Sequence, residues 1–462
     1  MTIPKSQLWR GVAFVAGFAL VVAPGVVHRY ARYQHDCGRA TTANEIVMVS
    51  GEDLNPGRRR QQLIKAWNDS VPTTGKMPAR LIELPGGADQ ERAQLLAAQQ
   101  LRSCTYDVLS LDVVWIPEFI RAGYLEEFLP SEFNRNQFLD KPWQAGTGDD
   151  GRQYAIPYHS DVGLLYYRKD IVPKQPRTWE DLRRAVTKKA LSKLGGKDPA
   201  GLATQLADYE GLTVNGMEAI WGAGGKVEWR NNKMVVDNAA ATGLRRLTDG
   251  MASSVIIGES AEFRESHSLE AFTDDRVLFL RNWPFAYQVI AADPLLKKRF
   301  GVAELPGPAP GSTPGSGALG GHGLAIPKNA LHKKEARELI AFLTEPVRQQ
   351  QLFACGGYVP VRKEVYQNVK ACSQVDRQVP PDSPEVGDPV SQEQLQELAG
   401  ILDAALERAR LRPDVPYYPA FSRAFHRYLH DSLTQGTVID APTLADRLTD
   451  CSQPTSPQAA CP

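Results

Sequence analysis

Carboxylate and amide side chains stand next to aromatic rings at several places in the chain. The groups are Asp112 near Trp115, Asp161 near Tyr158 and His159, Glu210 beside Tyr209, and Asn282 beside Trp283. A carboxylate accepts hydrogen bonds from two neighbouring hydroxyl groups, while a flat ring covers the C–H face of a pyranose. Any single pair is more often a helix cap or a solvated turn, so the recurrence of the pairs is what favours a carbohydrate site.

The common catalytic and cofactor-binding signatures are absent from the sequence. It contains no G-x-x-x-x-G-K-[ST] loop, no G-x-G-x-x-G turn after a predicted strand, and no H-E-x-x-H or G-x-S-x-G motif. His426 and His430 have the helical spacing of metal ligands, but the glutamate that would follow the first histidine is missing. We therefore predict no metal, no cofactor and no enzymatic activity. The alternative is a glycoside hydrolase in which two of the same carboxylates flank one glycosidic bond, about 5 to 9.5 Å apart.

Length and charge restrict the class of protein. The 462 residues are too many for one hydrophobic core, so we expect two lobes. Lys and Arg together number 53, as do Asp and Glu, so no overall field attracts a phosphate backbone. We expect no nucleic-acid partner.

The N-terminus carries an export or anchor signal. Residues 11–27 are uncharged and apolar, and they follow Lys5 and Arg10. The run is longer than the about 7 to 15 residues of a usual signal core and as short as the shortest membrane-spanning helices, about 17 residues. Both a cleaved signal and a retained anchor fit, and either places residues 38–462 outside the cytoplasm.

The cysteines are even in number, which favours disulfides in an exported chain. Closeness along the chain suggests that Cys355 pairs with Cys372 and Cys451 with Cys461, which leaves Cys37 for Cys104.

Strands and helices alternate at the start of the folded region. Residues 45–50, 79–84 and 106–115 have strand character, and helical patterns lie between them. This order predicts a parallel sheet covered by helices, which binds its ligand at the carboxyl ends of its strands. A helix over 176–193, with Thr178 as its N-cap, begins a second α/β unit.

Residues 150–182 resemble a known family, the extracellular solute-binding proteins of ABC importers, in the maltose/trehalose-type branch, and further similar segments extend the resemblance over about residues 45–448. The Gly-x-x-Tyr-x-x-Pro strand, the following Asp161, the Leu-Tyr-Tyr-x-Lys-Asp run and the Pro-x-Thr-Trp-x-Asp helix start carry the resemblance. It implies an α/β fold of the two-lobed, periplasmic-binding-protein-like type II, with three interlobe crossings at 155–162, 317–323 and 356–360. The expected parts are a signal or anchor with its linker (1–40), lobe 1 (41–155 plus 324–355), lobe 2 (163–316 plus 361–448) and a tail (449–462).

The resemblance and the chemistry together give a set of expected ligand contacts. Asp112, Asp161 and Glu210 would accept hydroxyl protons, Trp283 and Tyr358 would stack on sugar faces, and Arg412 would donate. The full set is Glu52, Asp53, Asn55, Asp112, Tyr158, His159, Asp161, Glu210, Asn215, Asn282, Trp283, Gly321, His322, Gly357, Tyr358 and Arg412. The chain departs from the family pattern at His322, where Gly-Gly-Trp is usual, and at His159, where an aromatic ring is common.

The predicted function is therefore that of a non-catalytic importer receptor. It would bind a di- or oligosaccharide of the trehalose or maltose kind as a monomer and pass it to ABC permease subunits in the membrane. It would act at the extracellular face, held by the N-terminal anchor or secreted after cleavage. A membrane-anchored sugar sensor for a signalling partner is the alternative reading of the same two-lobed fold.

Overall fold

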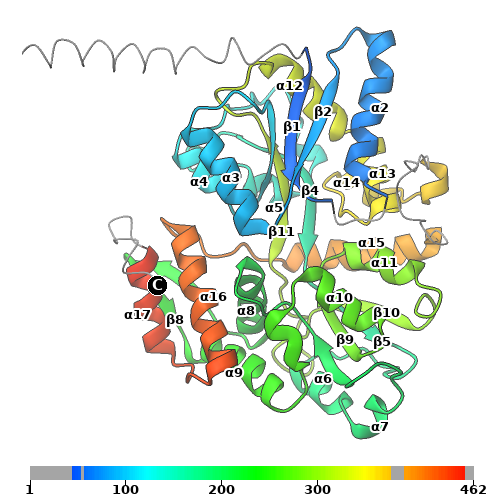
Figure 1. The fold of residues 1–462 in the computed structure, drawn as a ribbon, viewed down its shortest axis with the longest axis vertical. Coiled ribbons are helices and arrows are strands. Elements are labelled where there is room, and N and C mark those ends of the chain that lie inside the picture. The colour runs from blue at the N-terminus through cyan, green and yellow to red at the C-terminus, as the bar shows by residue number, and fades with distance from the viewer. Residues whose placement is uncertain (1–43, 54–56, 376–389, 453–462) are drawn as a thin grey trace, which may run out of the picture.

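The computed structural model describes residues 44–53, 57–375 and 390–452. Two α/β halves lie one above the other, each built around its own sheet (Figure 1). The predicted apolar segment 11–27 lies outside the described residues. Within the described ranges, no helix combines the length and the apolar character that crossing a membrane requires.

The first sheet contains the predicted alternation of strands and helices. Its order is β2-β1-β3-β11-β4, and β1 pairs in parallel with both β2 and β3. The connections through α2 and α3 let these parallel neighbours follow one another in the chain. The strands are β1 (Ile46–Gly51), β2 (Ala79–Leu84), β3 (Val108–Asp112), β4 (Ile156–Val162) and β11 (Leu319–Ala325).

The second sheet has the order β10-β5-β9-β6, and β7 and β8 form a separate hairpin. The strands are β5 (Leu164–Arg168), β6 (Ala200–Ala203), β7 (Val227–Arg230), β8 (Lys233–Val236), β9 (Val277–Asn282) and β10 (Phe300–Glu304). The two central strands are β5 and β9. Tyr166 of β5 and Phe279 of β9 are fully buried.

Helices cover both sheets (Figure 1). The α-helices of the first half of the chain are α2 (Arg59–Thr74), α3 (Ala88–Gln100), α4 (Ile116–Arg121), α5 (Asp140–Ala145), α6 (Trp179–Ala185), α7 (Lys188–Leu191) and α8 (Glu210–Gly222). Those of the second half are α9 (Asn238–Ala252), α10 (Glu265–Thr273), α11 (Phe285–Ala292), α12 (Lys333–Leu343), α13 (Pro346–Gly356), α14 (Lys363–Gln367), α15 (Gln392–Arg408), α16 (Tyr418–Gln435) and α17 (Ala441–Ser452). Short 3₁₀ turns are η2 (Arg135–Gln137), η3 (Gly258–Glu262) and η4 (Cys372–Gln374).

The predicted cap at Thr178 is confirmed, but the helix behind it is shorter than predicted. The Thr178 hydroxyl accepts from the Asp181 backbone N–H at 3.1 Å, and the Asp181 carboxylate accepts from the Thr178 N–H at 3.0 Å. Instead of one helix over 176–193, the chain forms α6 and α7, which are separated where Val186 leaves helical geometry. A second cap, the Thr187 hydroxyl, starts α7.

Two of the three predicted crossings are strands of the first sheet. Residues 156–162 form β4, and 319–325 form β11, which is inserted between β3 and β4 and is antiparallel to both. The chain passes toward the second sheet at Gly163, where a Cβ would lie only 2.3 Å from Oε1 of Glu218. The third segment, 356–360, joins α13 to α14, and Val359 bridges to Ser160 of β4. The number of crossings and the bounds of the lobes stay predictions.

The disulfide predicted from sequence closeness is present. Cys355 at the end of α13 is bonded to Cys372 at the start of η4. Cys104 and Cys451 are also disulfide-bonded. Their predicted partners, Cys37 and Cys461, lie outside the described residues.

Candidate binding cleft

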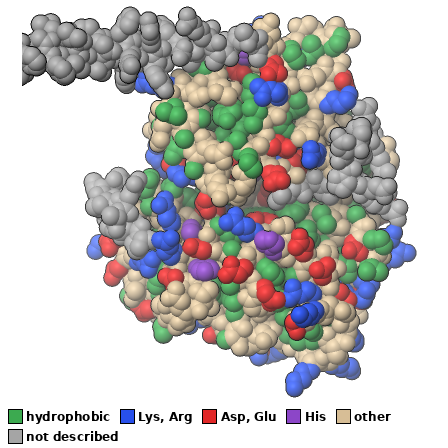
Figure 2. All heavy atoms as spheres, viewed as in Figure 1, with side chains coloured by type: hydrophobic (Ala, Val, Ile, Leu, Met, Phe, Trp, Pro, Cys, Tyr) green, Lys and Arg blue, Asp and Glu red, His purple; other side chains and the backbone are tan. Residues whose placement is uncertain are grey.

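A cleft of about 370 Å³ lies between the two sheets. Its walls come from the carboxyl ends of β1 and β3, from β4 and β11, and from the start of α3, α8 and α10. Charged side chains gather along the boundary between the two halves on the face shown in Figure 2. The structure brings these predicted residues together in the lining: Glu52, Asp112, His159, Asp161, Glu210, Trp283, Gly321, His322, Tyr358 and Arg412.

Arg412 connects the two halves across the cleft. Its side chain is buried, Nη1 donates to Oε1 of Glu210 at 2.8 Å, and Nη2 donates to Oδ1 of Asp112 at 3.2 Å. Asp112 is the last residue of β3 in the first sheet, whereas Glu210 is the first residue of α8, which belongs to the half with the second sheet. Burial alone would lower the pKa of Arg412, but the two carboxylates raise it above its ordinary value. We call this ion triad the clasp.

The clasp occupies carboxylate oxygens that were expected to accept sugar hydroxyls. Oε1 of Glu210 accepts from both Arg412 and the Tyr418 hydroxyl, the latter at 2.6 Å, and Oε2 accepts from Ser422. These donors fill much of the accepting capacity of both Glu210 oxygens. Glu210 is therefore held by the protein itself, and the same holds in part for Asp112.

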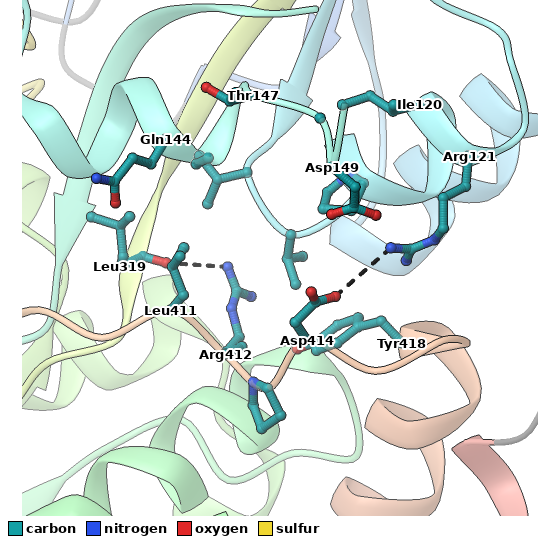
Figure 3. A pocket seen from close by; sticks show the side chains of 16 residues that line it. Ile120, Arg121, Gln144, Thr147, Asp149, Leu319, Leu411, Arg412, Asp414 and Tyr418 are labelled. Carbon is teal, nitrogen blue, oxygen red and sulfur yellow. Dashed lines mark hydrogen bonds and ion pairs between the residues drawn. The ribbon is translucent and has the colours of Figure 1, made fainter. Parts of the chain in front are cut away.

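A smaller cavity of about 170 Å³ lies on the other side of Arg412 (Figure 3). It separates α4 from the chain segment 411–414, and an ion pair of 3.7 Å between Arg121 and Asp414 spans its rim. Arg412 donates to the carbonyl oxygen of Leu319 at 3.4 Å and lines both cavities. The Arg412 side chain is thus part of the wall between them.

Two imidazole rings lie side by side in the floor of the cleft. His159 of β4 and His322 of β11 are partners in the strand register, and their ring centroids are 4.8 Å apart. Burial is the main cause that lowers the pKa of each ring to about 3, so both rings are neutral at physiological pH. The Arg60 cation acts in the same direction on both rings. The His159 ring also lies 4.8 Å from the ring of Tyr358.

Asp161 presents a carboxylate beside the Trp283 ring. A Cβ added at Gly320 would lie 3.2 Å from the Asp161 Cβ and 3.3 Å from the indole, so Gly320 lets the two approach the strand together. The Arg281 guanidinium covers the Trp283 ring at 4.2 Å from its centroid. Asp161 accepts no hydrogen bond from the described residues; its contact is His159 Nδ1 at 3.5 Å. Burial raises the pKa of Asp161 to about 7, and the Asp112 charge adds to the rise.

Comparison with known proteins decides the family. A family model described as bacterial extracellular solute-binding protein matches residues 80–379. The chain belongs to this family. The predicted role as a solute-binding component, rather than an enzyme, is therefore confirmed, and so is the extracellular class.

Relatives and solved structures agree with this placement. A probable ABC transporter-binding protein of Deinococcus radiodurans is 28% identical over 316 residues, 66% of this chain and 72% of the relative. An arabinooligosaccharide-binding protein of Bacillus subtilis is 22% identical over 320 residues, 66% and 70% of the two chains. The maltose-bound MalE3 structure of T. maritima is 28% identical, with a TM-score of 0.74 and coverage of 87% and 98%. The GacH receptor of Streptomyces glaucescens, at 19% identity, TM-score 0.71 and coverage of 89% and 97%, shows the fold alone.

Several predicted contacts of this solute-binding protein lie behind the cleft lining. Tyr158 is fully buried in the core under β4, because its side chain points to the opposite face of the strand from His159. The amide group of Asn215 is used within the second half, where it pairs with Thr204 and donates to the Gly211 carbonyl at 2.8 Å. Neither residue lines the cleft.

Three further predicted residues shape the lining from behind. Asn282 accepts from the Trp283 N–H at 2.8 Å and so fixes the start of that aromatic corner. Gly357 ends α13 with φ 75°, a conformation that favours glycine. Asp53 accepts from the Tyr358 hydroxyl at 2.5 Å, which positions that ring. Asn55 lies outside the described residues.

Six polar side chains that also line the cleft were not among the predicted contacts. They are Arg60, Glu91, Tyr209, Arg264, Glu265 and Ser266. Arg60 belongs to a run of arginines that resembles a solvated helix face, yet it is 4% exposed and donates to the Gly51 carbonyl at 2.9 Å. The available signal was its position, since the helix after β1 begins at the carboxyl end of that strand.

Proposed function

We propose that this solute-binding protein binds a di- or oligosaccharide in the interlobe cleft and delivers it to ABC permease subunits. The observation that carries the proposal is the meeting of Asp161 and Trp283 over Gly320, described above. An indole ring suits the C–H face of a pyranose, and the adjacent carboxylate suits its hydroxyl groups. The cavity volume, about 370 Å³, is in the range of about 300 to 1,000 Å³ that small-molecule sites have.

The named relatives support the same ligand class and the same partner. The ligands in the names of two of them are arabinooligosaccharides and maltose, and a third is a probable ABC transporter-binding protein. In this proposal the residues that line the cleft contact the ligand. The protein is a monomer whose two lobes close over the sugar, and it acts outside the cell. Trehalose and maltose are the first ligands to test. Attachment through residues 11–27, or their cleavage, is part of the same proposal.

Isothermal titration of the purified protein with maltose, trehalose and arabino-oligosaccharides tests the ligand class. We expect saturable binding of at least one of them, and Trp283→Ala should weaken that binding about 5- to 30-fold, because one ring face contributes about 1 to 2 kcal/mol. Trp229→Ala is the matched control, since Trp229 lies in the β7–β8 hairpin and does not line the cleft. The absence of saturable binding across the panel would refute the saccharide proposal.

Uptake in the native host tests the partner. Deletion of the gene should abolish uptake of the labelled sugar that binds best, and the wild-type gene should restore it. Uptake that continues at the same rate in the deletion strain would exclude the importer role and favour the sensor.

A further inference from the structure

The cleft is acidic although the whole chain is balanced at 53 basic and 53 acidic residues. Six carboxylates and three guanidinium groups line it: Glu52, Glu91, Asp112, Asp161, Glu210 and Glu265 against Arg60, Arg264 and Arg412. The arginines are already engaged. Arg412 is in the clasp, Arg60 is paired with Asp53, and Arg264 lies over the Tyr209 ring, 4.6 Å from its centroid. Acidic side chains therefore outnumber basic ones by six to three in the lining that faces the ligand.

Several polar groups in the floor lack a partner among the described residues. Glu91 is 6% exposed, and its Oε1 accepts no hydrogen bond. His159 is 4% exposed, and neither of its ring nitrogens has a hydrogen bond. Nδ1 of His322 is also buried without a hydrogen bond. A neutral imidazole offers one acceptor nitrogen, and a carboxylate offers only acceptors. Buried polar groups without partners cost free energy, so a ligand that supplies donors here gains accordingly.

We propose that the ligand carries a protonated amino group, as an aminodeoxy sugar does, and that this ammonium binds among Glu91, Asp161 and the imidazoles of His159 and His322. The inference rests on the proposed saccharide function and narrows its ligand class. An ammonium group brings three donors and a positive charge to this acceptor-rich floor, whereas a hydroxyl brings one donor.

Two cations act on these groups, and each also has a carboxylate partner of its own. Arg60 faces Glu91, Asp161 and both imidazoles, and its Nε lies 3.6 Å from Oδ2 of Asp53. Arg281 acts on Asp161 from behind and forms a bidentate pair with Glu218, with both distances 2.7 Å. Neither guanidinium therefore replaces the ligand as the counter-charge of Asp161.

Position 51 supports the same floor. Gly51 ends β1, and a Cβ there would lie 2.3 Å from Oε2 of Glu91. Only a glycine lets the Glu91 carboxyl lie against the end of the strand, where it lines the cleft. The carboxyl is thus packed closely against the end of the strand.

Titration calorimetry with matched sugars at about pH 6.5 tests the proposal, because the amine is protonated there. The probes are trehalose and 2-amino-2-deoxytrehalose, and cellobiose with its diamino and di-N-acetylamino counterparts. We expect the amino member of at least one series to bind about 10- to 100-fold more tightly than its hydroxyl and N-acetyl counterparts. If neutral sugars bind equally well or better in every series, the amino-group inference is wrong while the saccharide function stands. If no saccharide binds, both fail.

Variants locate the effect in the floor of the cleft. Burial raises the pKa of both Glu91 and Asp161 to about 7, so a bound ammonium favours the charged form of each carboxyl. In Glu91→Gln and in Asp161→Asn, the ratio of amine to hydroxyl affinity should fall toward one, because each change removes a group that the ammonium can hold as a carboxylate and keeps the side-chain shape. Glu397→Gln, on the exposed side of α15, is the control and should leave the ratio unchanged. A preference that persists in both floor variants would overturn the assignment.

Discussion

Replacing Asp161 with asparagine should stabilise the sugar-free protein at alkaline pH, although it removes a predicted ligand contact. Burial raises the pKa of this carboxyl from 3.8 to about 7. Between these values the folded protein keeps a proton that the unfolded chain has released. The wild-type free energy of unfolding therefore falls as pH rises from about 4 to about 7, and above pH 7 the charged carboxylate is held at a cost. Asparagine does not titrate and escapes this cost.

The size of the effect follows from the shift. About three pKa units correspond to at most about 4 kcal/mol. Because the Asp161 side chain is 22% exposed, solvent screens part of this, and we expect about 1 to 3 kcal/mol at pH 8 and close to zero at pH 4. The lowered pKa values of His159 and His322 give the opposite slope, a gain of stability as pH rises from about 3 to 6.5. Both histidines are present in both proteins and titrate below about pH 6.5, so the difference between the proteins at pH 8 reports on Asp161.

Urea unfolding at pH 4, 6 and 8, followed by fluorescence and far-ultraviolet circular dichroism, measures the difference. Coincident transitions are required, because a two-lobed chain need not unfold in one step. Asp249→Asn, an exposed position on α9, is the control and should not change with pH in this way. If Asp161→Asn is less stable than the wild type at pH 8, the carboxylate is stabilised by native contacts and the burial argument is refuted.

Two further predictions concern the clasp and the disulfide. Arg412→Met should lower the free energy of unfolding by about 3 to 5 kcal/mol, because it leaves Glu210 and Asp112 without their cation in a buried setting. Urea unfolding measures this loss. Joint replacement of Cys355 and Cys372 by alanine should cost about 3 kcal/mol, since the bond closes a loop with a sequence separation of 17, and thermal unfolding with and without reductant measures it.

Each of these has a matched control. Arg423 lies exposed on α16, so Arg423→Met tests whether loss of any arginine on that side of the chain is harmful. A cost for Arg412→Met no larger than that of Arg423→Met would show that the clasp contributes little. For the disulfide, reductant should lower the stability of the wild type but not of the double alanine variant, apart from any effect of the remaining bonded cysteines Cys104 and Cys451. Equal stability of the two oxidised proteins would contradict the prediction.

Local patterns in the sequence were enough for the local parts of the fold. The β1-α2-β2-α3-β3 alternation and the Thr178 cap depend on residues that are close in the chain, and both were predicted. The position of β11 was not predictable in this way. Its partners in β3 and β4 precede it by more than 150 residues, and its glycines and short apolar run resemble a loop. Segment 317–323 was therefore read as a crossing.

The sequence anticipated which residues gather at the cleft better than how each is bonded there. Ten of the expected residues line the cleft. Glu52 and Asp112 follow or end parallel strands, as the alternation of strands and helices predicted, whereas the resemblance to a known family supplied most of the others. Which carboxylate stays available could not be read from residue types. That depends on Arg412, which follows Asp112 by 300 residues and Glu210 by 202. Asp112, Asp161 and Glu210 look equivalent in the sequence, whereas in the fold only Asp161 is left without a donor from the described residues.

The polar groups of the cleft therefore divide into those the protein satisfies and those it does not. Glu210 has donors from Arg412, Tyr418 and Ser422, so it contributes to holding the halves together and gains little from a ligand. Asp161 has no such donor among the described residues, and both nitrogens of the buried His159 ring lack one, which is a cost to the sugar-free state. A ligand that donates to them relieves this cost at the moment of binding. The affinity and selectivity of the cleft should then depend most on the polar groups that lack hydrogen-bond partners without the ligand. For this reason a substitution such as Asp161→Asn can raise the free energy of unfolding and lower the ligand affinity at the same time.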